Sequence, residues 1–210
     1  MKLNRAFVEF SRRLKETPEI FKPWKGTIYR VTTLKYRDPD EILLGEGSYH
    51  HGGRWNAMGS FRAVYGSIDD VTALKESKAN AEYANLPYPF RETRLIVAVE
   101  VALSRVVDLS SAEILKLLGV TEEELRNEDW RKVQEQGFES LTQALGRAAF
   151  EAKAEGLLAF SARVPKAINV VYFPQNRLRG SKLRFWKAQK LQDLGLGVGK
   201  KASRSICRSL

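Results

Sequence analysis

Apolar residues near the N-terminus first recur at helical spacing and then alternate with polar ones. The helical spacing predicts an amphipathic helix that ends before Pro18, with an apolar face made of Leu3, Phe7, Phe10 and Leu14. Residues 26–34 (GTIYRVTTL) alternate and therefore predict a strand. A loop rich in Gly, Asp and Pro is expected from there to Ser60, and residues 61–67 (FRAVYGS) predict a second strand.

A helix is predicted over residues 71–84 (VTALKESKANAEYA), ended by Pro87 and Pro89. The side chains that can cap its start are those of Ser67, Asp69 and Asp70. The positions that would define an inward face by the helical period are Val71, Leu74 and Lys78. Glu76 is neither centred on that stripe nor opposite it, so periodicity does not decide whether Glu76 is an ordinary exposed residue.

The second half of the chain predicts helices followed by strands. Residues 94–103 (RLIVAVEVAL) form a continuous apolar run that predicts a central strand. Two capping boxes are expected ahead of helical runs, Ser110 with Glu113 and Thr121 with Glu124. The remaining predicted elements are a helix closed by Gly156 (141–156) and two short strands, LLAFSA (157–162) and INVVYFP (168–174).

This order of elements predicts one mixed α+β domain with at least one largely antiparallel sheet, because a regular alternation of strand and helix is missing. We expect three parts: an N-terminal helical extension (1–25), a main domain (26–178) and a basic C-terminal tail (179–210). The tail begins with a candidate short helix and continues in Gly, Ser, Lys and Arg, a composition that favours disorder.

The formal net charge of +10 raises the question of a nucleic-acid partner. Residues 175–210 contain ten Lys and Arg and a single acid, Asp193, so +9 of the charge lies in this segment and the rest of the chain is nearly neutral. A solvated or partner-contacting extension is favoured over a dedicated nucleic-acid arm, which stays open as an alternative.

Cysteine usage and hydropathy indicate a cytoplasmic protein. The single cysteine, Cys207, cannot form an internal disulfide, which fits a reducing compartment. We expect no membrane span, because no apolar run approaches the roughly 20 residues that one needs, and the N-terminus has no signal-peptide core. Neither a metal site nor a resident cofactor is expected, and no G-x-G-x-x-G motif supports hydride transfer.

The segment YHHGGRWN (49–56) holds the only two histidines of the chain and the most suggestive candidate chemistry. Arg54 follows Gly52 and Gly53, where the backbone can approach a ligand closely, and its guanidinium can bind a phosphate or carboxylate through two donors. Taken alone, such a segment is more often a structural turn anchored by its tryptophan, here Trp55.

The combination of TIYRV, GGRWN, AVYGS, ALKES and EGLLAFSAR…INVVYFP resembles the RES domain over roughly residues 26–175. The resemblance implies a fold similar to ADP-ribosyltransferases and a toxin of a RES–Xre type toxin–antitoxin system. It also implies an NAD⁺ glycohydrolase or phosphorylase, with NAD⁺ as substrate, water or inorganic phosphate as acceptor, and a cognate antitoxin, often DNA-binding, as partner. A homo-oligomer and a hetero-oligomer are both compatible with it.

The resemblance assigns a site residue by residue. The implied catalytic residues are Arg54, Tyr65, Glu76 and Ser161, and the implied substrate-binding residues are Tyr29, Arg30, Gly53, Trp55, Asn56 and Arg163. Glu76 would stabilise the cation that develops on the ribose, as in glycoside hydrolysis. Arg30 or Arg54 would clamp the pyrophosphate, Tyr65 would stack on the nicotinamide, and Ser161 with Arg163 would hold phosphate.

Two alternatives to this function remain. A protein ADP-ribosyltransferase would use the same residues and differ only in the acceptor. A non-catalytic RES-like module would bind nucleic acid through the basic tail, in which case binding should weaken steeply with salt.

Overall fold

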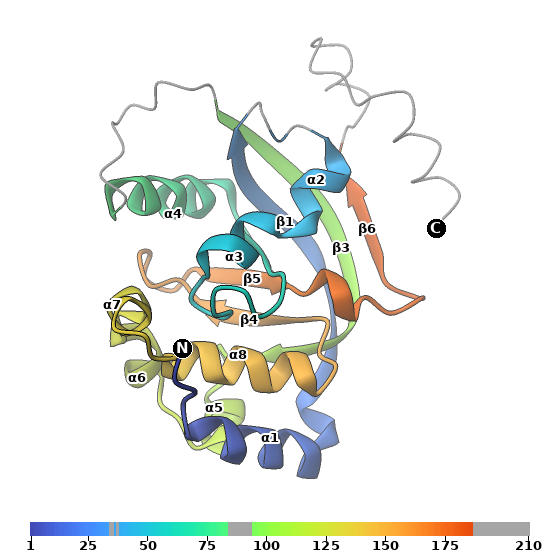
Figure 1. Ribbon diagram of the computed structural model, residues 1–210. Helices are drawn as coiled ribbons and strands as arrows, with labels where there is room; N and C mark the ends of the chain where they lie inside the picture. The colour runs from blue at the N-terminus through green and yellow to red at the C-terminus, as the bar shows by residue number, and fades with distance from the viewer. Residues whose placement is uncertain (34–35, 37, 84–93, 187–210) are drawn as a thin grey trace.

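The computed structural model describes residues 1–33, 36, 38–83 and 94–186 (Figure 1). Six strands form one sheet in the order β1-β2-β5-β4-β3-β6, and β1 also pairs with β3, so that five of the strands make a closed circuit. The strands are β1 Phe21–Thr33, β2 Val64–Ser67, β3 Arg94–Asp108, β4 Gly156–Phe160, β5 Ile168–Tyr172 and β6 Lys182–Phe185. All pairings are antiparallel except that of β3 with β4, which confirms the predicted α+β class.

Helices surround this sheet (Figure 1). They are α1 Ala6–Glu16, α2 Pro39–Leu44, α3 Glu46–His51, α4 Asp70–Tyr83, α5 Ala112–Leu118, α6 Glu122–Asn127, α7 Trp130–Glu135 and α8 Leu141–Glu151, with 3₁₀ turns at Pro18–Ile20 and Pro174–Asn176. None of the helices in the described ranges has the length and apolarity to cross a membrane.

Two hydrophobic clusters hold the layers together. One joins α1 and α8 to the sheet through residues such as Phe10, Leu145 and Phe173, and the other is made mainly of strand residues such as Ile28, Val99 and Val170. Figure 1 shows α8 below β4 and β5, with α1 beneath it. These clusters fix the strands whose ends carry the site described below.

The backbone of α8 lies directly against the loop that contains Trp55. A Cβ added at Gly146 would lie 1.9 Å from the Trp55 carbonyl oxygen, so only glycine allows this approach. The buried side chain of Gln143, one turn earlier, donates from Nε2 to the Gly53 carbonyl oxygen at 3.1 Å. Helix α8 therefore positions the loop that contains Gly53 and Trp55, called the glycine-rich loop below.

Several predicted elements are present with different boundaries. The strand expected over residues 26–34 begins at Phe21, and the expected long loop down to Ser60 contains α2 and α3. The short helix expected at the start of the tail is instead strand β6, because Leu183 and Phe185 alternate into the second hydrophobic cluster. Pro87, Pro89 and residues 187–210 lie outside the described residues, and the division into three parts stays a prediction.

The helix caps predicted from the sequence agree with the structure in part. Thr121 and Glu124 form the predicted capping box, whereas α5 is capped by Ser111, and Ser110 bonds to Asp108 instead. The helix predicted to close at Gly156 ends at Glu151. Gly156 lies in β4, where an added Cβ would be 2.3 Å from the Val171 carbonyl oxygen of the neighbouring strand. This glycine serves a close strand contact and not a helix end.

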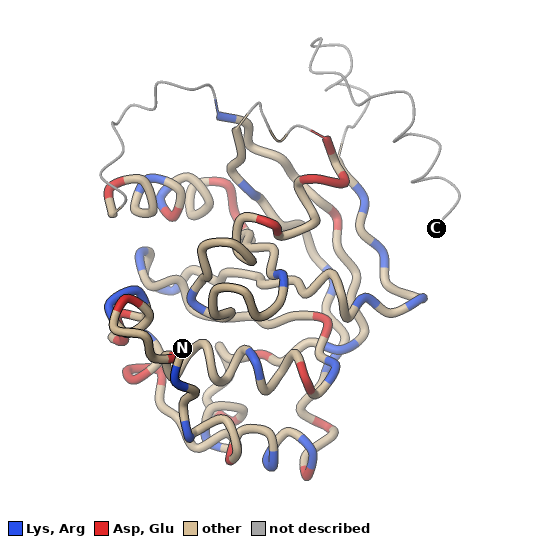
Figure 2. The backbone as a smooth tube through the Cα atoms, viewed as in Figure 1, with Lys and Arg blue, Asp and Glu red and all other residues tan. Residues whose placement is uncertain are grey.

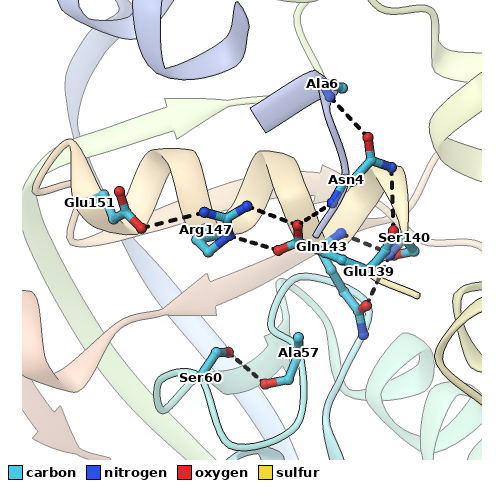
Figure 3. Close-up of polar contacts among 9 residues, drawn as sticks. All are labelled: Asn4, Ala6, Ala57, Ser60, Glu139, Ser140, Gln143, Arg147 and Glu151. Atoms are coloured by element: carbon cyan, nitrogen blue, oxygen red, sulfur yellow. Dashed lines mark hydrogen bonds and ion pairs between the residues drawn. The ribbon is translucent and has the colours of Figure 1, made fainter. Parts of the chain in front are cut away.

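A buried ion pair ties the N-terminal segment to α8 (Figure 3). The fully buried Glu139 carboxylate accepts from Arg147 Nε at 2.7 Å and Nη2 at 2.8 Å, and from the Asn4 backbone N–H at 2.9 Å. Asn4 also donates from Nδ2 to the Glu139 carbonyl oxygen. The start of the chain is thereby joined to the same helix that supports the glycine-rich loop.

The substitution Arg147→Met is expected to lower the free energy of unfolding by about 3 kcal/mol, because it leaves a buried carboxylate without its cation. Urea denaturation measures this change. Arg12→Met is the matched control, since Arg12 bonds only to exposed carboxylates of its own helix and its loss should change little. Equal effects of the two substitutions would contradict the role given to the buried pair.

Candidate active site

A cavity of about 510 Å³ opens between α4, the strands β1 and β2, the glycine-rich loop and α7. This volume lies in the range of roughly 300–1,000 Å³ that small-molecule sites occupy. The predicted site residues that line it are Tyr29, Arg30, Gly53, Arg54, Trp55, Tyr65, Glu76 and Arg163. Segments far apart in the sequence thus meet at one cavity, whereas the predicted site residues Asn56 and Ser161 are not part of its lining.

Helix α4 leaves room for this cavity because its inward face is made of small and polar residues. Five of the six residues of α4 that line the cavity are small or polar, Ala73, Glu76, Ser77, Asn80 and Ala81, at helical spacing; the sixth is Tyr83, the last residue of the helix. Val71 and Leu74, which the apolar pattern would have placed inward, are exposed by 54% and 46%. The inward stripe of α4 is therefore not its most apolar one, and it contains Glu76.

The Glu76 carboxylate is held by a chain of hydrogen bonds. Its Oε1 accepts from Ser161 Oγ at 2.6 Å and from Asn169 Nδ2 at 2.8 Å, while Asn169 Oδ1 accepts from the hydroxyl of Ser67 at 2.7 Å. Ser161 is fully buried, and its Oγ also accepts from the backbone N–H groups of Arg163 and Val164. Ser161 thus lies behind the carboxylate and orients it.

The glycine-rich loop is fastened by Tyr65 and Asn56. The Tyr65 hydroxyl accepts from the Trp55 N–H at 2.9 Å and donates to Asn56 Oδ1 at 2.7 Å. Asn56 is fully buried and donates from Nδ2 to the carbonyl oxygens of Ser48 and Phe61. A Cβ at Gly53 would lie 2.4 Å from the Tyr65 hydroxyl, so this position has no space for a side chain.

Burial raises the pKa of Tyr65, so its phenol stays neutral at physiological pH. The hydroxyl is fully used within the loop, and the ring borders the cavity. Trp55 is only 4% exposed and belongs mainly to the core. Contacts of Tyr65 and Trp55 with a substrate stay predictions.

Two of the arginines that line the cavity come from strand β1 and from the glycine-rich loop. Arg30 Nη1 donates to the Tyr65 carbonyl oxygen at 2.8 Å, and its buried Nε has no hydrogen-bond partner among the described residues. Arg54 Nη1 donates to the Leu125 carbonyl oxygen at 2.7 Å. Burial lowers the pKa of both side chains, and Glu76 partly opposes this effect at Arg54. Both guanidinium groups are therefore incompletely neutralised where they border the cavity.

Sequence reasoning missed two residues of the site. Asn169 lies on β5 and donates a hydrogen bond to Glu76. The one sequence feature that could have pointed to it is that a polar residue interrupts the apolar run INVVYFP. Arg131 lines the cavity from α7, and nothing in its sequence neighbourhood marks it. Of the two histidines, His51 lines the cavity, whereas His50 is 3.6 Å from Glu46 on the outside.

The described lining residues include five arginines, Arg30, Arg54, Arg94, Arg131 and Arg163, and Glu76 as the only carboxylate. Figure 2 shows basic positions on α7 and on the loop between β4 and β5, which lie on the same side of the molecule. Arginines suit phosphate groups, and a positioned carboxylate can stabilise a developing cation. The site can therefore hold a phosphorylated ligand next to a centre that becomes positive.

Fold and site together define an α+β protein with a glutamate-centred, arginine-lined cavity built on a largely antiparallel sheet. Residues 27–189 match the family model described as the RES domain. This match covers most of the sequence, so the chain belongs to the RES domain family, as the sequence motifs predicted.

Known relatives were found by sequence and by structure. The NAD(+) phosphorylase MbcT of Mycobacterium bovis is 27% identical over 137 residues, which cover 64% of this chain and 67% of the relative. MbcT of Mycobacterium tuberculosis has the same identity and coverage. The crystal structure of the M. tuberculosis MbcT-MbcA toxin-antitoxin complex has a TM-score of 0.65 at 23% identity, covering 85% of this chain and 90% of that chain. The structural likeness supports the fold.

Proposed function

We propose that this protein is a toxin that consumes NAD⁺ by cleaving the bond between nicotinamide and ribose, with inorganic phosphate or water as acceptor. The observation that carries the proposal is the Glu76 carboxylate, which Ser161 and Asn169 orient at the edge of an arginine-lined cavity. Membership of the RES domain family and similarity to an NAD(+) phosphorylase support it.

Cleavage of this bond places positive charge on the anomeric carbon of the ribose, as in glycoside hydrolysis. Glu76 stabilises that charge, because Oε1 is fixed by two hydrogen bonds and the carboxylate faces the cavity. Arg30 and Arg54 bind the pyrophosphate through their uncompensated guanidinium groups. Tyr65 places its ring against the nicotinamide, and its hydroxyl keeps the glycine-rich loop in position.

The acceptor attacks the same carbon as the bond to nicotinamide breaks. Arg163 and the region around Ser161 are the proposed phosphate contacts, since Arg163 lines the cavity two residues after the serine that bonds to Glu76. Water and protein side chains approach the same atom. The structure of the site therefore favours NAD⁺ cleavage in general, and the proposal of phosphate as acceptor rests on the similarity to an NAD(+) phosphorylase.

The proposal includes a protein partner. MbcT is found in a complex with MbcA that is described as toxin and antitoxin. By this similarity we propose that a cognate antitoxin neutralises the present protein and that NAD⁺ loss inhibits growth when the antitoxin is missing. DNA binding by that antitoxin and a cytoplasmic location belong to the same proposal.

Purified protein without antitoxin is expected to release nicotinamide from NAD⁺. Mass spectrometry of the products identifies the acceptor: ADP-ribose indicates water, and ADP-ribose 1″-phosphate indicates phosphate. NAD⁺ that stays intact with and without phosphate would contradict the proposal. Protein modified with ADP-ribose would show transfer to a side chain, and salt-sensitive nucleic-acid binding without NAD⁺ loss would favour the non-catalytic alternative.

A further inference from the structure

Arg131 is a cavity-lining cation to which the proposed function gives no role. Its Nη2 donates to Asn80 Oδ1 at 2.6 Å. The guanidinium lies 4.4 Å from the ring centroid of Trp130 and 4.5 Å from that of Tyr83. These neutral partners fix its position between α7 and α4 and leave it a full positive charge.

This charge has no carboxylate partner. Among the described residues no carboxylate oxygen lies within 4.0 Å of the guanidinium nitrogens of Arg131, Arg54 or Arg163. Burial lowers the pKa of Arg131, and the neighbouring cation Arg163 lowers it further, while Asp129 and Glu76 partly oppose this effect from a greater distance. Leaving Arg94 aside, the described lining carries four arginines, Arg30, Arg54, Arg131 and Arg163, against Glu76 alone, which is more positive charge than the pyrophosphate of one dinucleotide compensates.

The cations come from different elements. Arg30 lies on β1 and Arg54 on the glycine-rich loop, whereas Arg131 lies on α7 and Arg163 on the loop after β4. Glu76 acts on the pKa of both Arg54 and Arg131, and the Arg163 backbone N–H donates to Ser161 Oγ, which bonds to Glu76, so these three arginines lie near the proposed reaction centre. Asn80, which holds Arg131, follows Glu76 by four residues on α4, so the two side chains project from the same face of the helix.

We infer that Arg131 and Arg163 bind the inorganic phosphate that accepts the ADP-ribosyl group, so that Arg131 determines whether phosphate or water attacks. A phosphate oxygen forms the new bond to the anomeric carbon while the bond to nicotinamide breaks. The bonding pair goes to the ring nitrogen, which loses its positive charge. The proton of hydrogen phosphate stays on the phosphate group of the product until it passes to solvent. This inference rests on the proposed function.

The substitution Arg131→Met in the full chain tests the inference by steady-state kinetics with NAD⁺ and inorganic phosphate. The KM for phosphate is expected to rise by roughly 10- to 100-fold, the loss that removal of a charged hydrogen-bond donor produces. At fixed phosphate the product shifts from ADP-ribose 1″-phosphate toward ADP-ribose, and the KM for NAD⁺ changes little.

Two further variants separate binding from folding. Arg131→Gln keeps a donor for Asn80 and removes the charge, so it should raise the KM for phosphate as Arg131→Met does. Lys132→Met removes an exposed cation of the same helix, paired only with Asp129, and should leave both KM values unchanged. Urea denaturation checks that the variants are folded.

Three results would overturn the inference while NAD⁺ cleavage stands. Two are kinetic: an unchanged KM for phosphate in both Arg131 variants, or a rise confined to the KM for NAD⁺. The third is that the unsubstituted protein forms only ADP-ribose in the presence of phosphate. The failure of the proposed function is distinguishable from these. In that case the unsubstituted protein leaves NAD⁺ intact with and without phosphate.

Discussion

Replacing Glu76 with glutamine is expected to lower kcat for NAD⁺ cleavage by roughly 10³-fold, the size of effect found when a preorganised electrostatic contact to the transition state is removed. Glutamine has nearly the same shape and keeps an oxygen that can accept from Ser161 and Asn169. What is lost is the negative charge facing the ribose. Nicotinamide release at saturating NAD⁺ measures the change.

The control for this substitution lies on the same helix. Glu82 is largely exposed, and its carboxylate is 3.7 Å from Lys78 Nζ, so Glu82→Gln should leave kcat unchanged. Near-normal activity of the Glu76→Gln protein would show that another group stabilises the cation. A loss of activity accompanied by an equal loss of unfolding free energy in urea would instead assign Glu76 a structural role.

The sequence predicted the strands of the sheet better than the helices that shape the site. The apolar runs 94–103, 157–162 and 168–174 all correspond to strands, because their burial on the sheet leaves a direct trace in hydropathy. The face of α4 could not be predicted in the same way. Its inward residues are mostly small or polar since they border a cavity, so the apolar positions of the helix do not mark the inward face and periodicity left the orientation of Glu76 undecided.

The candidate site residues were proposed through the resemblance to the RES domain, which gave no indication of their hydrogen-bond partners. Arg54, Tyr65 and Glu76 come from different elements and line one cavity. The contacts of Glu76 with Asn169 and of Arg131 with Asn80 join positions 93 and 51 residues apart. Such pairs depend on how the sheet and helices pack, which local periodicity does not encode.

The substitution Arg30→Met is expected to lower activity without lowering stability. It removes the guanidinium proposed to bind the pyrophosphate, so kcat/KM for NAD⁺ should fall by roughly 100-fold. Within the part of the chain that the structure describes, the buried Arg30 side chain has no carboxylate oxygen within 4.0 Å and its Nε has no hydrogen-bond partner. Removing such a group relieves a desolvation cost, so the free energy of unfolding should be unchanged or higher.

Arg105→Met is the control that separates the expected effects of Arg30→Met on activity and stability from a general effect of losing an arginine. Arg105 donates to the carbonyl oxygens of Lys153 and Ala152 and lies 4.0 Å from the ring centroid of Phe21, outside the cavity lining. Its loss should leave kcat/KM for NAD⁺ unchanged and lower the free energy of unfolding. If Arg30→Met lowered both kcat/KM for NAD⁺ and the free energy of unfolding, Arg30 would be a structural residue. If kcat/KM fell while the free energy of unfolding did not, the protein would keep a destabilising charge because its ligand neutralises it.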